Sequence, residues 1–124
     1  MEKITHRQIV EYRNRFLQQQ GGKCALCGED ITDDAVLDHC HKTGRLRAVL
    51  HRGCNALLGK IENNMPRNRV SLSRLNNICK SLVDYISAER ADIIHPTYKT
   101  QEERTMAQRG RKKKKNMRGG SRRG

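Results

Sequence analysis

Two sets of metal-binding side chains lie within one short stretch of the chain, between residues 24 and 55. The first set consists of thiol and imidazole groups, which suit zinc: Cys24, Cys27, His51 and Cys54. The second set consists of the Asp38 carboxylate and the Asn55 amide, whose oxygens suit a hard cation such as magnesium. His39 follows Asp38 directly and is a candidate general base. The stretch therefore has the ligands for a soft metal site and a hard one.

The spacing of the sulfur and imidazole groups predicts one tetrahedral zinc site. Cys24 and Cys27 are separated by two residues, and so are His51 and Cys54. Two knuckles of this spacing can grip one ion, whereas a redox dithiol would use the first pair alone. Cys40 offers a thiolate that could replace His51, but it would pull the candidate catalytic segment toward the zinc. We therefore favour His51 as the fourth ligand of a structural zinc.

A DNA-reading finger with two cysteines and two histidines is another use of the first knuckle. Its histidines would be His39 and His41, which have a single residue between them. In a helix these two side chains would point about 200° apart. Because such fingers need roughly three to five residues between the histidines, the spacing disfavours this alternative.

Short elements of secondary structure should hold these residues in place. Ala35 to His39 and Leu46 to Leu50 have the character of two strands joined by a turn, and a short helix should follow from about Gly53. Since Asn55 directly follows the last zinc ligand, the zinc would also fix this amide near Asp38. The expected fold is a small α+β domain with a zinc-stapled strand, strand, helix core.

Two amphipathic helices and a tail are expected around this core. Thr5 to Gln8 has capping-box spacing, and apolar residues recur at helical intervals, which predicts a helix over residues 6 to 20. The segment from Asn63 to Pro66 should break the chain, and Asn68 should cap a second helix with one apolar face. The expected segments are an N-terminal helix over 1–22, the zinc-bound core over 23–65, a helix and dimer contact over 66–92, and an extended, disordered basic tail over 93–124.

The net charge of +13 is concentrated near the C-terminus, because residues 109–124 contain nine Lys and Arg and no acidic residue. A segment so basic and so poor in apolar residues should stay disordered and attract polyanions, with an affinity that falls as salt rises. Nucleic acid is the expected partner. The alternatives are a merely solubilising tail or a nuclear address at Lys112–Lys115.

The size and composition of the chain limit its own core. With 124 residues, 35% hydrophobic content and no Trp, it needs a metal, disulfides or a second subunit for stability, and the ligand cluster favours a metal. The first six residues do not resemble a signal peptide, and the longest apolar runs are triplets, so neither secretion nor membrane crossing is expected. We expect a cytoplasmic protein with reduced thiols and no membrane partner.

Residues 23–62 resemble the phage recombination endonuclease VII family, the Holliday-junction-resolving nucleases of the His-Me finger or HNH superfamily. The resemblance rests on C-A-L-C-G, on L-D-H-x-H-K-T-G-R-L-R-A-V-L and on C-N-A-L-L-G. The family commonly has a second C-x-x-C pair and a D-H-D-H core, where this chain has His51 and Cys40. The resemblance implies a ββα-metal fold and a DNA endonuclease of branched substrates, acting in the host cytoplasm if phage-encoded.

The resemblance also implies a role for each site residue. Asp38 and Asn55 would hold magnesium or manganese against the scissile phosphate, and His39 would activate water. His41 matches a second family histidine and would contact phosphate. Nearby basic side chains would position DNA strands: Arg45, Arg47, Arg52 and Lys60. A homodimer is implied because cutting opposed strands of a junction takes two active centres.

Two other functions use the same residues. One is a general nicking or degradative nuclease with the same chemistry. The other is a noncatalytic, zinc-stapled nucleic-acid-binding module. Such a module has no need for a base flanked by two hard-metal ligands, so Asp38, His39 and Asn55 favour a metal-dependent DNA endonuclease.

Overall fold

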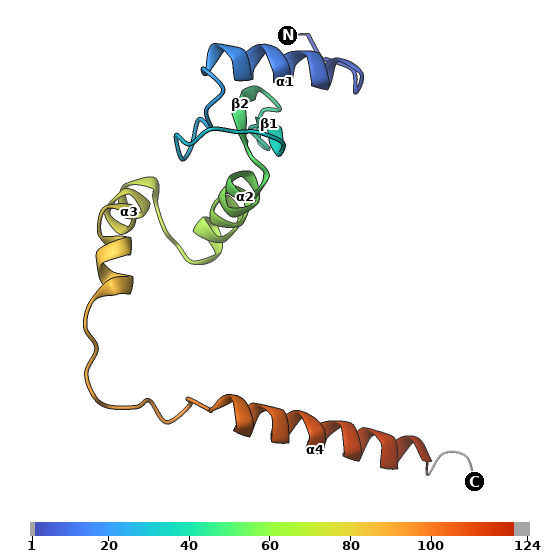
Figure 1. Ribbon diagram of the computed structural model, residues 1–124, viewed down its shortest axis with the longest axis vertical. Helices are drawn as coiled ribbons and strands as arrows, with labels where there is room; N and C mark the ends of the chain where they lie inside the picture. The colour runs from blue at the N-terminus through green and yellow to red at the C-terminus, as the bar shows by residue number, and fades with distance from the viewer. Residues whose placement is uncertain (1, 121–124) are drawn as a thin grey trace. The chain divides into compact units, whose positions relative to one another are not determined.

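The computed structural model describes residues 2–120 and contains a hairpin followed directly by a helix (Figure 1). Strand β1 (Ala35–His39) pairs antiparallel with β2 (Leu46–His51), and helix α2 (Arg52–Arg67) begins at the next residue. In the turn, Gly44 has a left-handed φ of 76°, which glycine adopts without strain. The predicted α+β fold and its strand, strand, helix order are confirmed.

Strand β2 carries a bulge opposite Asp38. The register shifts between Leu37 and His39, so the two residues Arg47 and Ala48 together oppose the single residue Asp38. A bulge of this kind bends the strand and re-aims its side chains. It accompanies the contact between the Arg47 guanidinium and the Asp38 carboxylate that is described below.

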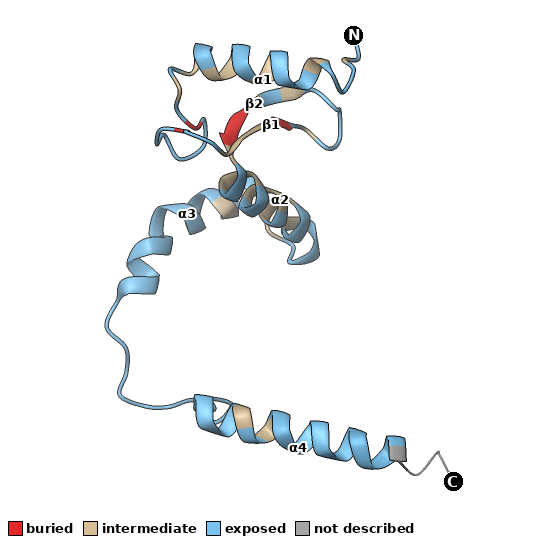
Figure 2. Ribbon diagram, turned by 45° about the vertical axis from the view of Figure 1, so that its right-hand side comes forward, coloured by how far each residue is buried: buried red, intermediate tan, exposed pale blue. Residues whose placement is uncertain are grey.

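The core lies between the hairpin, the first cysteine knuckle and helix α1 (Gln8–Gln19). Figure 2 shows buried residues on β2 and on the segments beside it. Phe16 and Leu17 are the α1 residues that pack on this core. Among the described residues, the buried apolar ones are Cys24, Ile31, Val49 and Leu50, of which Val49 is fully buried. The small size of this cluster agrees with the expected need for a metal.

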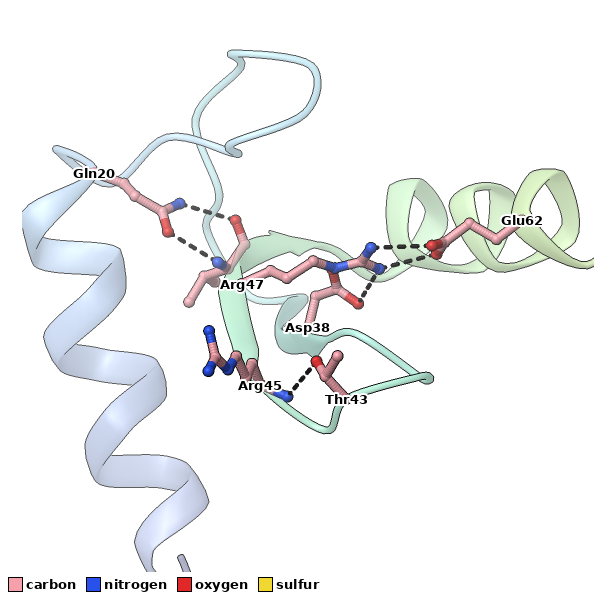
Figure 3. Close-up of polar contacts among 7 residues, drawn as sticks. Gln20, Asp38, Thr43, Arg45, Arg47 and Glu62 are labelled. Atoms are coloured by element: carbon pink, nitrogen blue, oxygen red, sulfur yellow. Dashed lines mark hydrogen bonds and ion pairs between the residues drawn. The ribbon is translucent and has the colours of Figure 1, made fainter. Parts of the chain in front are cut away.

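The side chain of Gln20 fastens the end of α1 to the hairpin (Figure 3). Its Nε2 donates to the carbonyl oxygens of Val49 and Lys23, both at 2.8 Å. Its Oε1 accepts from the Val49 N–H, also at 2.8 Å. One amide side chain thus satisfies both backbone groups of a buried strand residue, as a neighbouring strand would.

The ends of α1 and α2 differ from the expected boundaries. Helix α1 is shorter than the predicted range 6–20, and its N-cap is Arg7 rather than Thr5. Gln8 Oε1 accepts from the Thr5 N–H at 2.8 Å, which is one of the two bonds of a capping box. Helix α2 continues through Pro66, so the predicted break at residues 63–66 is wrong. Its end is closed by the Val70 N–H, which donates to the Met65 carbonyl at 2.8 Å beside a left-handed Arg69, in the manner of a Schellman motif.

Helix α3 (Leu72–Ser87) follows after a short connection. Ser71 caps it, because the Arg74 N–H donates to Ser71 Oγ at 3.1 Å. The predicted cap, Asn68, instead lies at the C-terminal end of α2. All α3 residues except Leu75 are exposed, so the described residues leave most of the predicted apolar face uncovered.

The chain divides into two compact units after Val83, and the second unit contains helix α4 (Gln101–Gly120). The structure therefore differs here from the expected extended tail, of which residues 121–124 lie outside the described range. Thr100 Oγ1 accepts from the Glu103 N–H at 3.2 Å, and acidic residues in the first turn suit the positive end of the helix dipole. Arg, Lys, Gln and Met in the sequence that follows are good helix formers.

Across residues 2–120, no helix combines the length and the apolar character that crossing a bilayer requires.

Candidate functional site

Three cysteines and one histidine come together where the first knuckle meets the start of α2. The Sγ atoms of Cys27 and Cys54 lie 3.3 and 3.8 Å from Nδ1 of His51. Zinc-ligand bonds of about 2.0–2.3 Å place tetrahedral ligands about 3.5–3.8 Å apart, so the distances fit zinc. The ligand atoms of Cys24, Cys27, His51 and Cys54 all lie within 4.8 Å of one another.

Hydrogen bonds orient this cluster. His51 Nε2 lies 2.9 Å from the Asp30 carbonyl oxygen, and a proton on Nε2 leaves the Nδ1 lone pair facing the thiols. In the first knuckle, the Gly28 N–H donates to the Cys24 carbonyl at 2.9 Å, and Gly28 has a left-handed φ of 79°. Cys40 lies in the hairpin turn and is outside the metal-type cluster found among the described residues.

The pKa values of two thiols in the cluster, those of Cys24 and Cys54, are shifted in opposite directions. Burial acts to raise the pKa of Cys24, but backbone N–H groups, first that of Cys27, outweigh it and lower the pKa to about 6. Burial, followed by the Cys27 and Cys24 thiols, raises the pKa of Cys54 to about 11. Crowded thiolates repel one another, so a cation is needed for all of them to ionise near neutral pH. This donor set is consistent with structural zinc.

Asp38 is buried, and its carboxylate is held by Arg47 (Figure 3). Arg47 Nε donates to Asp38 Oδ2 at 2.7 Å, and Nη2 donates to Oδ1 at 3.2 Å. The same guanidinium grips Glu62 of α2, with Nη1 to Oε2 at 3.0 Å and Nη2 to Oε1 at 2.9 Å. The Glu62 carboxylate, and next that of Asp38, raise the pKa of Arg47 above its already high value. Arg47 in turn lowers the pKa of Glu62.

Asn55 lies near the start of α2 and is half-buried. It precedes Glu62 by seven residues, and this spacing puts both residues on one face of the helix. Because Glu62 reaches the guanidinium that holds Asp38, this face of α2 is turned toward the hairpin. Within the described residues, Asn55 shares this face but makes no hydrogen bond to Asp38.

The two candidate catalytic histidines are exposed and adjacent. The ring centroids of His39 and His41 lie 4.6 Å apart, with planes tilted by 45°. His39 ends β1 and opens onto a cleft of about 690 Å³. One wall of the cleft is the hairpin and the other is the N-terminal segment. The residues that line the cleft are Glu2, Lys3, Ile4, His39, Thr43, Gly44, Arg45 and Leu46.

The four basic residues expected near DNA have different surroundings. Arg45 lines the cleft beside His39, whereas Arg52 and Lys60 are exposed on α2. Arg47 is engaged by two carboxylates. Sequence reasoning missed Glu62, for which the spacing of seven residues from Asn55 was the available signal.

Comparison with known families covers most of the chain. Residues 2–88 match the family model described as recombination endonuclease VII. The match includes helices α1 and α2, the hairpin and all four residues of the metal-type cluster. It extends well beyond the motifs on which the sequence resemblance rests. The chain therefore belongs to the recombination endonuclease VII family, a family of DNA endonucleases.

Proposed function

We propose that the protein is a metal-dependent endonuclease that hydrolyses phosphodiester bonds and prefers branched DNA, as in junction resolution. One observation carries the proposal more than any other. The buried, oriented Asp38 carboxylate directly precedes His39, which is exposed at a cleft of about 690 Å³. A fixed carboxylate beside an accessible base is the arrangement that a metal-assisted hydrolase needs.

Asp38 and Asn55 are the proposed holders of magnesium or manganese. Their carboxylate and amide oxygens are hard ligands, which these ions prefer. The surroundings fit a cation, because the two carboxylates of Asp38 and Glu62 face the single positive charge of Arg47. When bound, the ion supplies positive charge to the phosphate and to the departing 3′ oxygen.

The exposed histidines and arginines would act on water and on the DNA strands. In its neutral form, His39 accepts a proton from the attacking water. His41, whose ring lies 4.6 Å from that of His39, contacts a phosphate oxygen from the same side. Arg45, Arg52 and Lys60 position the strands through phosphate contacts, which carry little sequence information.

The cluster of Cys24, Cys27, His51 and Cys54 (the Cys3His cluster) supports this site without taking part in the reaction. Zinc at Cys54 fixes the first turn of α2, and thereby the neighbouring Asn55. Zinc at His51 fixes the end of β2, the strand that also carries Arg47. The two ligands of the second knuckle would thus tie β2, which carries Arg47, and α2, which carries Asn55, to one ion.

A second copy of the chain is the proposed cover for α3. The exposed apolar side chains of this helix include Leu72, Val83 and Tyr85, each more than 70% exposed. Burying such a face in a dimer would also bring two active centres together, as the resolution of a junction requires.

Helix α4 is the proposed second contact with nucleic acid. It contains the run Lys112–Lys115 and further arginines, and its acidic residues are confined to the first turn. Such a helix attracts phosphates independently of base sequence.

Cleavage of matched substrates tests this proposal. Zinc-loaded protein is incubated with a four-way junction, a linear duplex and a single strand, first without magnesium and then with it. Omission of magnesium is preferable to a chelator, which would also extract zinc. We expect magnesium-dependent cleavage, fastest on the junction. Equal cleavage of the linear duplex would favour the general nuclease, and an absence of cleavage on every substrate would contradict the proposal.

A further inference from the structure

We propose that Arg47 and Glu62 are positioning residues that set the orientation and charge of the Asp38 carboxylate, and that Arg47 is not a DNA contact. This inference rests on the proposed function, because it concerns how Asp38 is prepared for a cation. It departs from the expectation that every basic residue near the site serves to position DNA strands.

The hydrogen bonds of Arg47 engage most of the N–H groups that could otherwise bind DNA. All three of its side-chain nitrogens donate to carboxylates: Nε to Asp38, Nη1 to Glu62, and Nη2 to both. The four distances lie between 2.7 and 3.2 Å, as in two charge-assisted forks. Four of its five N–H groups are engaged, so a DNA phosphate could reach only the second Nη1 N–H without displacing a carboxylate.

The backbone explains why the forks form. The bulge in β2 places Arg47 and Ala48 opposite Asp38. Glu62 approaches the guanidinium from α2, whose beginning the Cys3His cluster holds. The planar guanidinium therefore links β1, β2 and α2, and it fixes both carboxylate oxygens of Asp38, a residue that is only 6% exposed.

The network also controls charge. Arg47 uses one lone pair on each Asp38 oxygen, and each oxygen retains a second one that can face a cation. With Glu62 ionised, Arg47, Asp38 and Glu62 together carry one net negative charge. Without Glu62, the Arg47–Asp38 pair has no net charge. The N–H groups of Arg47 that Glu62 had engaged can then compete with the cation for the Asp38 oxygens. Glu62 should therefore raise the affinity of the site for a divalent cation, although it lies behind the arginine.

Cation binding by Glu62→Gln protein tests this role without requiring activity. We would titrate zinc-loaded protein with Mn²⁺ in the absence of DNA and follow free Mn²⁺ by electron paramagnetic resonance. Glu11→Gln is the matched control, because Glu11 also pairs with an arginine, at 3.0 Å, but on the exposed face of α1. We expect roughly five- to tenfold weaker Mn²⁺ binding for Glu62→Gln, the Coulomb effect of one charge on a divalent ion several Å away in a water-like dielectric. Glu11→Gln should bind as the unmodified protein does.

DNA binding without magnesium distinguishes a positioning arginine from a DNA contact. If Arg47 is a positioning residue, Glu62→Gln should bind a junction within about twofold of the unmodified affinity, with the same salt dependence. If Arg47 is a DNA contact that Glu62 restrains, the substitution should tighten binding and steepen the salt dependence. The second result would overturn the inference, as would unchanged Mn²⁺ binding.

Arg47→Lys gives an independent kinetic test. Lysine keeps the charge but lacks the planar fork, so it cannot bridge two carboxylates in the same way. We expect a lower kcat with little change in KM for DNA. A raised KM with unchanged kcat would indicate a lost phosphate contact and contradict the inference. Because the Mn²⁺ titration needs no cleavage, a protein that cuts no DNA would refute the proposed function while the titration still judged the role of Glu62.

Discussion

Replacement of Gln20 by methionine should destabilise the fold strongly, although Gln20 is a polar residue at the end of a surface helix. Methionine has a similar length but cannot form the three side-chain hydrogen bonds, each 2.8 Å long, that Gln20 makes. The Val49 N–H would then lose its partner at a residue that is 0% exposed. The Val49 carbonyl would keep its bond from the Ala25 N–H at 3.2 Å.

The expected loss follows from these contacts. A buried N–H without a partner costs about 1–3 kcal/mol, and each of the other two lost bonds costs about 0.5–1 kcal/mol because its acceptor keeps another partner or is exposed. The sum is about 2–5 kcal/mol, a large share of the stability of a small domain. In a domain of this size it corresponds to a fall in Tm of roughly 10–25 °C.

Urea and thermal unfolding at one fixed free zinc concentration would measure this loss. Gln19→Met is the matched control, because Gln19 is an exposed neighbour on the same helix. The control should change the free energy of unfolding by less than about 0.5 kcal/mol. Equal stability of the two variants would refute the argument that the Gln20 amide holds the edge of β2.

Three further predictions concern the metal cluster, the acidic pH range and the basic helix. Cys54→Ser should lose zinc and unfold, because structural zinc contributes about 10 kcal/mol or more to folding. His51→Cys should keep both its zinc and its fold, since zinc accepts four thiolates. Metal analysis and circular dichroism would check this, and a folded, zinc-free Cys54→Ser protein would contradict it. Arg47 holds the pKa of Glu62 below its ordinary 4.5, so this carboxylate stabilises the fold above pH 4.5 and the contribution is lost as pH falls through the lowered value. Glu62→Gln should remove this pH dependence of the free energy of unfolding, which amounts to at most about 1 kcal/mol for a partly exposed pair. Urea unfolding at pH 3–6 would measure it, and the same loss of stability toward low pH in Glu62→Gln would contradict the prediction. Truncation after Thr100 should flatten the salt dependence of DNA binding by several units of slope, whereas an unchanged slope would exclude α4 as a phosphate contact.

The parts of the structure that sequence reasoning predicted well depend on local spacing. Two pairs of ligands with two residues between them specify two knuckles, and this information lies within a few residues of Cys24 and of Cys54. The hairpin is equally easy to predict from the sequence, because two strand-like segments flank a short turn that contains Gly44. In each of these cases, neighbours along the chain carry the signal.

The parts that it missed depend on contacts between distant segments. The contact of Gln20 with Val49 spans 29 residues, and nothing in the polar run of glutamines distinguishes the one that turns inward. The contact of Arg47 with Asp38 depends on a bulge, and a shift of one residue reverses the face on which a strand side chain lies. Pro66 predicted a break, but in the last turn of α2 its missing N–H removes only one bond.

Single-turnover cleavage of a four-way junction by His39→Ala protein tests the central claim most directly. The claim is that His39, beside the buried Asp38, is the base of a metal-dependent endonuclease. His6→Ala is the control, because His6 is an exposed histidine outside the site. With magnesium present, His39→Ala should remain folded and zinc-loaded but cleave about 10²–10⁴-fold more slowly, the usual contribution of a general base, while His6→Ala cleaves normally. Cleavage by His39→Ala at the unmodified rate would contradict the account.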